Sequence, residues 1–115
     1  MNIEEFREYC LSKSATSEST PFDESTLVFK VHGKMFSLTN IEKFEGINLK
    51  CDPEYAIQLR EENEGIQPGF HMNKTHWNTV STDGSVTDEL LMELIDQSYD
   101  LVVKGMRKKV RDSLK

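Results

Sequence analysis

The sequence lacks the features that mark a membrane protein, a disulfide-rich secreted protein or a phosphate-loop enzyme. Its apolar runs span only two or three residues, whereas a transmembrane helix needs about 20. Two cysteines among 115 residues are too few for a disulfide scaffold. The six glycines are scattered singly, so no glycine-rich loop is available to cradle a phosphate.

A secretion signal is also missing from the N-terminus. The first five residues include Glu4 and Glu5, and they lack the basic start and apolar stretch of a signal peptide. We therefore expect a cytoplasmic protein whose Cys10 and Cys51 are reduced and buried.

The composition indicates one folded domain over residues 1–115. A chain of this length leaves no room for a second sizeable core. Ten aromatic residues and many β-branched residues supply the apolar surface that disordered chains lack.

Charge is distributed unevenly, with the basic residues concentrated at the end of the chain. The net charge is −6, yet residues 101–115 carry six basic residues and one acidic residue. The dense part of this cluster consists of Lys104, Arg107, Lys108, Lys109 and Arg111. Such a cluster commonly complements the negative end of a last helix. Binding a polyanion would require a local patch that overcomes the overall repulsion within about 8–10 Å.

Helix signals occur in three places. Asn2 and Glu5 form a capping-box pattern before a helix at about residues 3–13. Asp52 and Pro53 begin a second helix that runs to about residue 63. Thr87 caps a longer helix whose apolar stripe continues to residue 102 and which ends or kinks at Gly105.

Alternating residues predict five strands, at 27–32, 35–39, 47–51, 70–73 and 77–81. Residues 12–25 and 65–69 are expected to be loops or turns. A two-residue turn at Gly33-Lys34 would join the first two strands. That register assigns one face to the core and the other to solvent: Phe29, Val31, Phe36 and Leu38 inward, and Lys30, His32, Met35 and Ser37 outward.

These elements predict an α+β fold, a two-layer sandwich in which helices pack on one face of an antiparallel sheet. The other face of the sheet would look outward. On that face, Lys30 and Lys50 would lie beside Lys74, His76 and Trp77. These last three residues belong to the segment 68–80, which holds two of the three histidines and the only tryptophan.

Cationic side chains next to an aromatic plane suit contacts with phosphates and bases. Alternatively, Trp77 fills the core and the nearby polar residues only stabilise a turn, and for Trp77 itself we expect burial.

Metal binding and catalysis are weakly supported. His71 and His76 could join Cys51 or Asp52 as ligands, but the spacing matches no zinc motif and no second pair completes the set. Cys51 falls on the inward side of its strand, where a thiol is ordinarily inert. We therefore expect neither a cofactor nor a bound metal, and no enzymatic activity.

Four stretches of the chain are distinctive in combination: Phe29 to Phe36, Asn48 to Glu54, Pro68 to Val80 and Ser98 to Val102. They resemble, in order, the MmcQ/YjbR family of small bacterial proteins, and the His-Met-Asn-Lys-x-His-Trp-Asn core is the most specific part. The resemblance implies a CyaY-like sandwich related to frataxin, with a double-wing motif and DNA binding. The implied function rests on the fold.

Three hypotheses follow. The leading one is a non-enzymatic, monomeric protein that binds DNA through a basic and aromatic surface, with no membrane partner. Its candidate residues are Lys30, Lys50, Lys74, His76, Trp77, Lys104, Arg107, Lys108 and Arg111. The second is an adaptor whose open sheet face meets a partner protein, and the third is an enzyme or metal-handling domain that uses His71 and His76.

Overall fold

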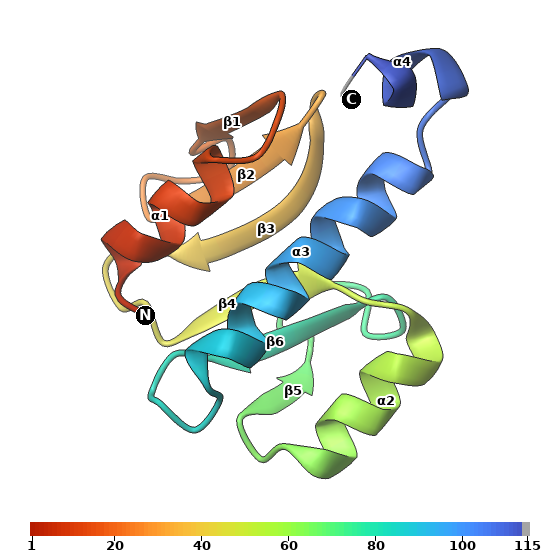
Figure 1. Cartoon of the computed structure of the whole chain (residues 1–115). Helices are drawn as coiled ribbons and strands as arrows, with labels where there is room; N and C mark the ends of the chain where they lie inside the picture. The colour runs from red at the N-terminus through yellow and green to blue at the C-terminus, as the bar shows by residue number, and fades with distance from the viewer. Residues whose placement is uncertain (114–115) are drawn as a thin grey trace.

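The protein is a six-stranded antiparallel sheet with its helices packed on one face, as the computed structural model of residues 1–113 shows (Figure 1). The strand order is β1-β2-β3-β4-β6-β5. The elements are α1 (Ile3–Leu11), β1 (Thr16–Ser19), β2 (Thr26–Val31), β3 (Lys34–Asn40), β4 (Gly46–Lys50), α2 (Pro53–Glu62), β5 (Ile66–Pro68), β6 (Trp77–Ser81), α3 (Asp88–Lys104) and α4 (Lys108–Asp112). The predicted α+β class is confirmed. None of the helices in the described part of the chain combines the length and apolarity needed to cross a bilayer.

The three main helices begin at the predicted caps. The Asn2 side chain accepts a hydrogen bond from the Glu5 N–H at 2.9 Å, and the Glu5 carboxylate accepts one from the Asn2 N–H at 3.0 Å. Asp52 and Thr87 likewise accept hydrogen bonds from backbone N–H groups in the first turns of α2 and α3. These contacts satisfy donors that the helix itself leaves unpaired, which fixes where each helix starts.

The core lies between the helices and the sheet. The rings of Phe6 on α1 and Phe29 on β2 meet edge to face, with their centroids 5.3 Å apart. Both cysteines are free and buried, as expected. The Ser98 hydroxyl of α3 donates to the Phe36 carbonyl at 2.5 Å and accepts from the Lys50 N–H at 2.9 Å, so it links α3 to both β3 and β4.

The predicted turn between β2 and β3 is wrong by one residue. Val31 pairs with Lys34, so the two turn residues are His32 and Gly33, with φ angles of 46° and 77°. Two consecutive positive φ values correspond to a type I′ turn, which matches the twist of the flanking strands. His32 therefore lies in the turn and not in the outward row of a strand.

A bulge in β3 corrects the predicted faces of two more residues. Phe29 pairs with Ser37 and Lys30 pairs with Met35, so Phe36 is an extra residue on β3. Past this bulge, Ser37 lies on the helix-covered face, opposite Phe29. Leu38 lies on the other face, where it packs with Val28.

Both edge strands were missed. The segment predicted as a loop at 12–25 contains β1, and the segment predicted as a turn at 65–69 contains β5. Residues 70–73, predicted as a strand, form a loop. Pro68 lacks an N–H, and such a residue fits an edge position better than the interior of a sheet.

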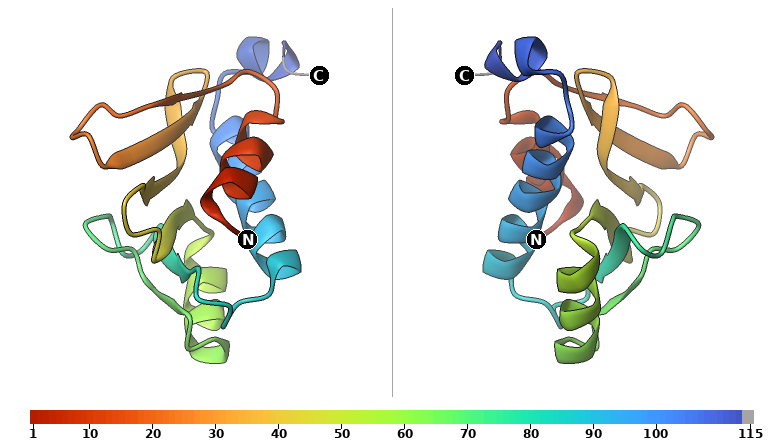
Figure 2. Two further views of the ribbon diagram at one scale, coloured as in Figure 1. Left: turned by 90° about the vertical axis from the view of Figure 1, so that its left-hand side faces the viewer. Right: turned by 90° about the vertical axis from the view of Figure 1, so that its right-hand side faces the viewer.

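Two connections project from the sheet on the side away from the helices. Figure 2 shows this arrangement for the β1–β2 connection, residues 20–25, and for the β5–β6 connection, residues 69–76. Between them lies the face of the sheet that no main helix covers.

Candidate functional site on the open sheet face

The open face is the surface of the sheet opposite the helices. Strand alternation and the register of the pairs place its side chains on β2, β3, β4 and β6: Val28, Lys30, Met35, Leu38, Asn48, Lys50, Trp77 and Thr79.

A small apolar cluster occupies the centre of the open face. Trp77 packs with Val28 and Leu38, and Met35 and Met72 lie against them. Only 9% of the Trp77 side chain is exposed, which confirms the expected burial. Trp77 therefore offers no free ring plane to a ligand, although it lies on the predicted face.

Two lysines of the predicted set flank this cluster. Lys30 pairs with Met35 across β2 and β3, and Lys50 pairs with Trp77 across β4 and β6. Both lysines are half-buried, and within residues 1–113 neither forms an ion pair. Their charges are thus held beside apolar surface, which strengthens their attraction for an anion.

The segment 69–76 folds back onto the sheet through its own hydrogen bonds. Gly69 donates its N–H to the Trp77 carbonyl at 2.8 Å, and the Lys74 ammonium donates to the Gly69 carbonyl at 2.9 Å. The Asn73 side chain accepts from the N–H groups of Thr75 and His76. A Cβ at residue 69 would lie 2.8 Å from that of Trp77, so only glycine allows this close approach.

Phe70 is the functional candidate that sequence reasoning missed. Its N–H donates to the Thr79 hydroxyl at 2.9 Å, and its carbonyl accepts from the Asn48 amide at 3.2 Å. Thr79 in turn donates to the Asn48 side-chain oxygen. The backbone of Phe70 is therefore fastened to β4 and β6, while 67% of its side chain is exposed. The His71 ring lies against it, with centroids 4.1 Å apart.

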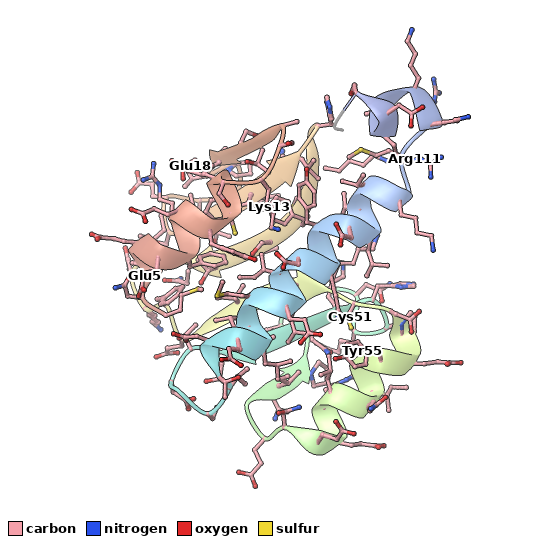
Figure 3. All side chains as sticks on the ribbon, viewed as in Figure 1. Glu5, Lys13, Glu18, Cys51, Tyr55 and Arg111 are labelled. Carbon is pink, nitrogen blue, oxygen red and sulfur yellow. The ribbon has the colours of Figure 1, made fainter. Side chains whose placement is uncertain are left out.

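The basic C-terminal cluster lies apart from the open face. Lys104 is in the last turn of α3, and Arg107, Lys108 and Arg111 belong to the segment at and before α4. This segment extends beyond the end of α3, as the labelled Arg111 shows (Figure 3). Lys104 also lines a surface pocket together with Asp52 and Asp100. The structure thus places Lys30, Lys50 and Trp77 on the open face and places Lys74 and the exposed His76 in the adjoining loop 69–76, and it leaves the C-terminal residues separate.

The residues weighed for catalysis do not form a reactive group. Burial is the main cause that raises the pKa of Cys51 to about 11, so its sulfur remains a thiol near neutral pH. His71 and His76 are both exposed. In the described part of the chain, no three His, Cys, Asp or Glu side chains are grouped to hold a metal ion.

Charge separates sharply between the two layers. Helices α1, α2 and α3 carry eleven acidic and three basic residues, a net charge of −8. Strands β2 to β6 and the loop 69–76 contain no Asp or Glu, and their four charged residues are Lys30, Lys34, Lys50 and Lys74. The net charge of −6 therefore conceals five strands, β2 to β6, whose charged residues are all lysines. Glu18 lies on the edge strand β1 and pairs with Arg7.

Comparison with known proteins gives consistent matches over most of the chain. The YjbR family model matches residues 11–101. The chain is 33% identical to the uncharacterized protein YjbR of Escherichia coli K12 over 115 residues, 99% of this chain and 98% of that protein. It is 39% identical to the uncharacterized protein YbdF of Escherichia coli O157:H7 over 90 residues, 77% of this chain and 74% of that protein.

Solved structures resemble it closely. The crystal structure of Deinococcus radiodurans protein DR2400 has a TM-score of 0.92 and 42% identity, with 98% of this chain and 87% of that chain covered. A crystal structure of a Pseudomonas syringae protein has a TM-score of 0.76 and 29% identity, covering 88% of this chain and 98% of that one.

Proposed function

The chain belongs to the YjbR family, and on that premise we propose that it is a non-enzymatic protein that binds nucleic acid through the open face. The observation that carries the proposal is the charge of strands β2 to β6 and the loop 69–76, which hold four lysines and no carboxylate, whereas helices α1 to α3 have a net charge of −8. A polyanion would approach the lysine side and be repelled from the helix side, so the charge sets the orientation of binding.

Contacts from Lys30 and Lys50 to phosphates supply affinity in this proposal. Each lysine that neutralises a phosphate releases a condensed counterion, which makes the affinity depend on salt. Lys74 contributes through its position in the loop, although its ammonium also donates to the Gly69 carbonyl. The C-terminal cluster is not required, because it lies beyond the end of α3.

The test is a salt titration of binding to labelled DNA, with Lys30→Ala and Lys50→Ala compared against Lys43→Ala. Lys43 is an exposed lysine in the β3–β4 connection, so its loss changes the net charge equally. We expect each open-face variant to weaken binding and to reduce the slope of log affinity against log salt by about 0.7–0.9. Lys43→Ala should leave both nearly unchanged. Absence of binding at low salt, or an equal effect of Lys43→Ala, would reject the proposal.

A protein partner is the second candidate, favoured by the exposed side chains of Phe22 and Phe70 in the two projecting connections. In that case a protein captured from the host should stay bound to this chain after nuclease treatment. Its capture should be lost on substitution of the two phenylalanines and should depend little on Lys30 and Lys50.

A further inference from the structure

Phe70 combines an exposed ring with a backbone that is fastened to the sheet. Burying a phenylalanine is ordinarily favourable, yet 67% of this side chain remains exposed. Meanwhile its N–H and carbonyl are both held by side chains of the open face, Thr79 and Asn48. A backbone held in place before binding loses little conformational entropy when a partner covers the ring.

The loop of Phe70 and the strands that anchor it, β4 and β6, contain lysines and no carboxylate, whereas Glu45, Glu64 and Asp83 line a surface pocket next to Thr79. The loop 69–76 carries Lys74, and the strands beside it carry Lys50 and no acidic residue. A partner that fits this surface needs an apolar planar group next to negative charge. Nucleic acid with unpaired bases has both, because each base exposes a flat face while its phosphates remain charged.

We propose that the partner of the open face is single-stranded nucleic acid and that one of its bases stacks on Phe70. This inference rests on the proposed function and specifies its ligand. In a duplex the flat faces of the bases are covered by their neighbours, so the ring has nothing to stack on. A phosphate beside the stacked base then reaches Lys50 on β4, and a strand that continues across β3 reaches Lys30 on β2.

Phe22 provides a matched comparison within the same molecule. It is 66% exposed and lies in the other projecting connection, residues 20–25 (Figure 2). That connection contains Asp23 and Glu24 and no basic residue. Hydrogen bonds from Ser25 and Thr26 lower the pKa of Asp23, which keeps this carboxylate charged and repels phosphate. The proposal therefore assigns stacking to Phe70 and not to Phe22.

The experiment measures binding of the full chain to four 12-residue probes by fluorescence polarisation at low salt. The probes are oligothymidylate, oligouridylate, a DNA duplex and a DNA strand whose sugars lack bases. Phe70→Leu keeps an apolar side chain and removes the ring plane, and Phe22→Leu makes the same change in the acidic connection. Urea unfolding of each variant verifies that the exposed substitutions leave the fold intact.

We expect the wild-type protein to bind oligothymidylate about tenfold more tightly than the base-free strand. Phe70→Leu should abolish that difference, and Phe22→Leu should preserve it. Oligouridylate and oligothymidylate both present unpaired bases, so their relative affinities show whether the protein prefers single-stranded RNA or single-stranded DNA.

Two results would overturn the inference and leave nucleic-acid binding in place. One is duplex binding as tight as single-strand binding, and the other is an equal effect of Phe22→Leu and Phe70→Leu. Failure of all four probes to bind would instead reject the proposed function itself.

Discussion

The helix-covered face and the open face of the sheet use their polar groups differently. On the helix side, several charged and polar side chains meet partners within the protein. For example, the Asp96 carboxylate accepts hydrogen bonds from Tyr9 at 2.6 Å and from Lys13 at 2.5 Å. On the open face, Lys30 and Lys50 form no ion pair within residues 1–113, and the Phe70 ring is left exposed.

This difference separates the groups that hold the fold together from those available to a partner. Substitutions under the helices should change the free energy of unfolding and leave the affinity of the folded protein alone. Substitutions of open-face lysines should do the reverse. Thr79 belongs to both groups: it lies on the open face, and its hydroxyl also fastens the loop 69–76 to the sheet.

Among substitutions that test the difference between the two faces, Ser98→Ala is expected to have the largest effect on the free energy of unfolding. The change leaves the Phe36 carbonyl and the Lys50 N–H without their partner inside the protein. Unpaired groups of this kind cost about 2–4 kcal/mol in total, measurable by urea unfolding. Ser17→Ala, at an exposed position of β1, is the control and should be nearly neutral. A loss below about 1 kcal/mol would show that other groups replace the hydroxyl.

The second effect is a loss of stability at alkaline pH that originates on the helix side. Burial raises the pKa of Cys10 from 9.0 to about 12, and a hydrogen bond to Asp96 raises the pKa of Tyr9 from 10.0 to about 12. The unfolded chain therefore releases these protons first, so stability is fully present below pH 9 and falls as pH rises toward 12.

Urea unfolding between pH 7 and pH 11 measures this dependence. The Cys10 thiol should account for about 2–3 kcal/mol of the loss by pH 11. Cys10→Ala should flatten the pH profile even if it lowers stability at pH 7. An unchanged profile in that variant would assign the alkaline loss to other groups.

A smaller effect is expected for Thr79→Val, which tests the boundary between the two roles. The variant removes the hydroxyl that accepts from the Phe70 N–H and donates to Asn48. We expect about 1 kcal/mol lower stability and weaker binding of single strands, because the ring loses its fixed position. Thr75→Val, at an exposed position of the same loop, should change neither quantity. Full binding by Thr79→Val would mean that the anchor is structural only.

The smallest effect is expected for Arg7→Gln on α1. Arg7 forms hydrogen bonds to both oxygens of Glu18 on β1, and this contact lowers the pKa of Glu18. Arg7 is exposed and Glu18 is only partly buried, so water and salt screen the pair. The urea midpoint should not move measurably at moderate salt. A clear shift would show that the pair helps to hold α1 against the edge of the sheet.

The parts of the fold that the sequence predicted are those with strong local signals. Capping residues located the starts of α1, α2 and α3, and alternation located β4 and β6. In contrast, β1 consists of polar residues and is a strand because it pairs with β2, which no local pattern reveals. Glycine suits the first central position of a type II′ turn and either central position of a type I′ turn. Gly33 alone therefore did not decide which two residues form the turn; the observed register, with its bulge at Phe36, does.

The candidate site was predictable only in part. Strand alternation put Lys30 and Lys50 on one face, and the structure places them there. Trp77 lies on the same face but is covered by its neighbours. One of these is Met72, in a loop whose path the sequence does not reveal, so the burial of Trp77 by this loop was not predictable. Phe70 was assigned to a strand, although the preceding Pro68-Gly69 signalled a turn. The family resemblance is confirmed by the match over residues 11–101.

The sheet ends in short strands on both sides, β1 with four polar residues and β5 with three residues that include Pro68. Such margins give another chain few backbone groups to pair with. Copies crowded together during refolding therefore find only short edges on which to add further strands. We expect recovery from denaturant to remain reversible at concentrations that would precipitate a sheet with long apolar margins.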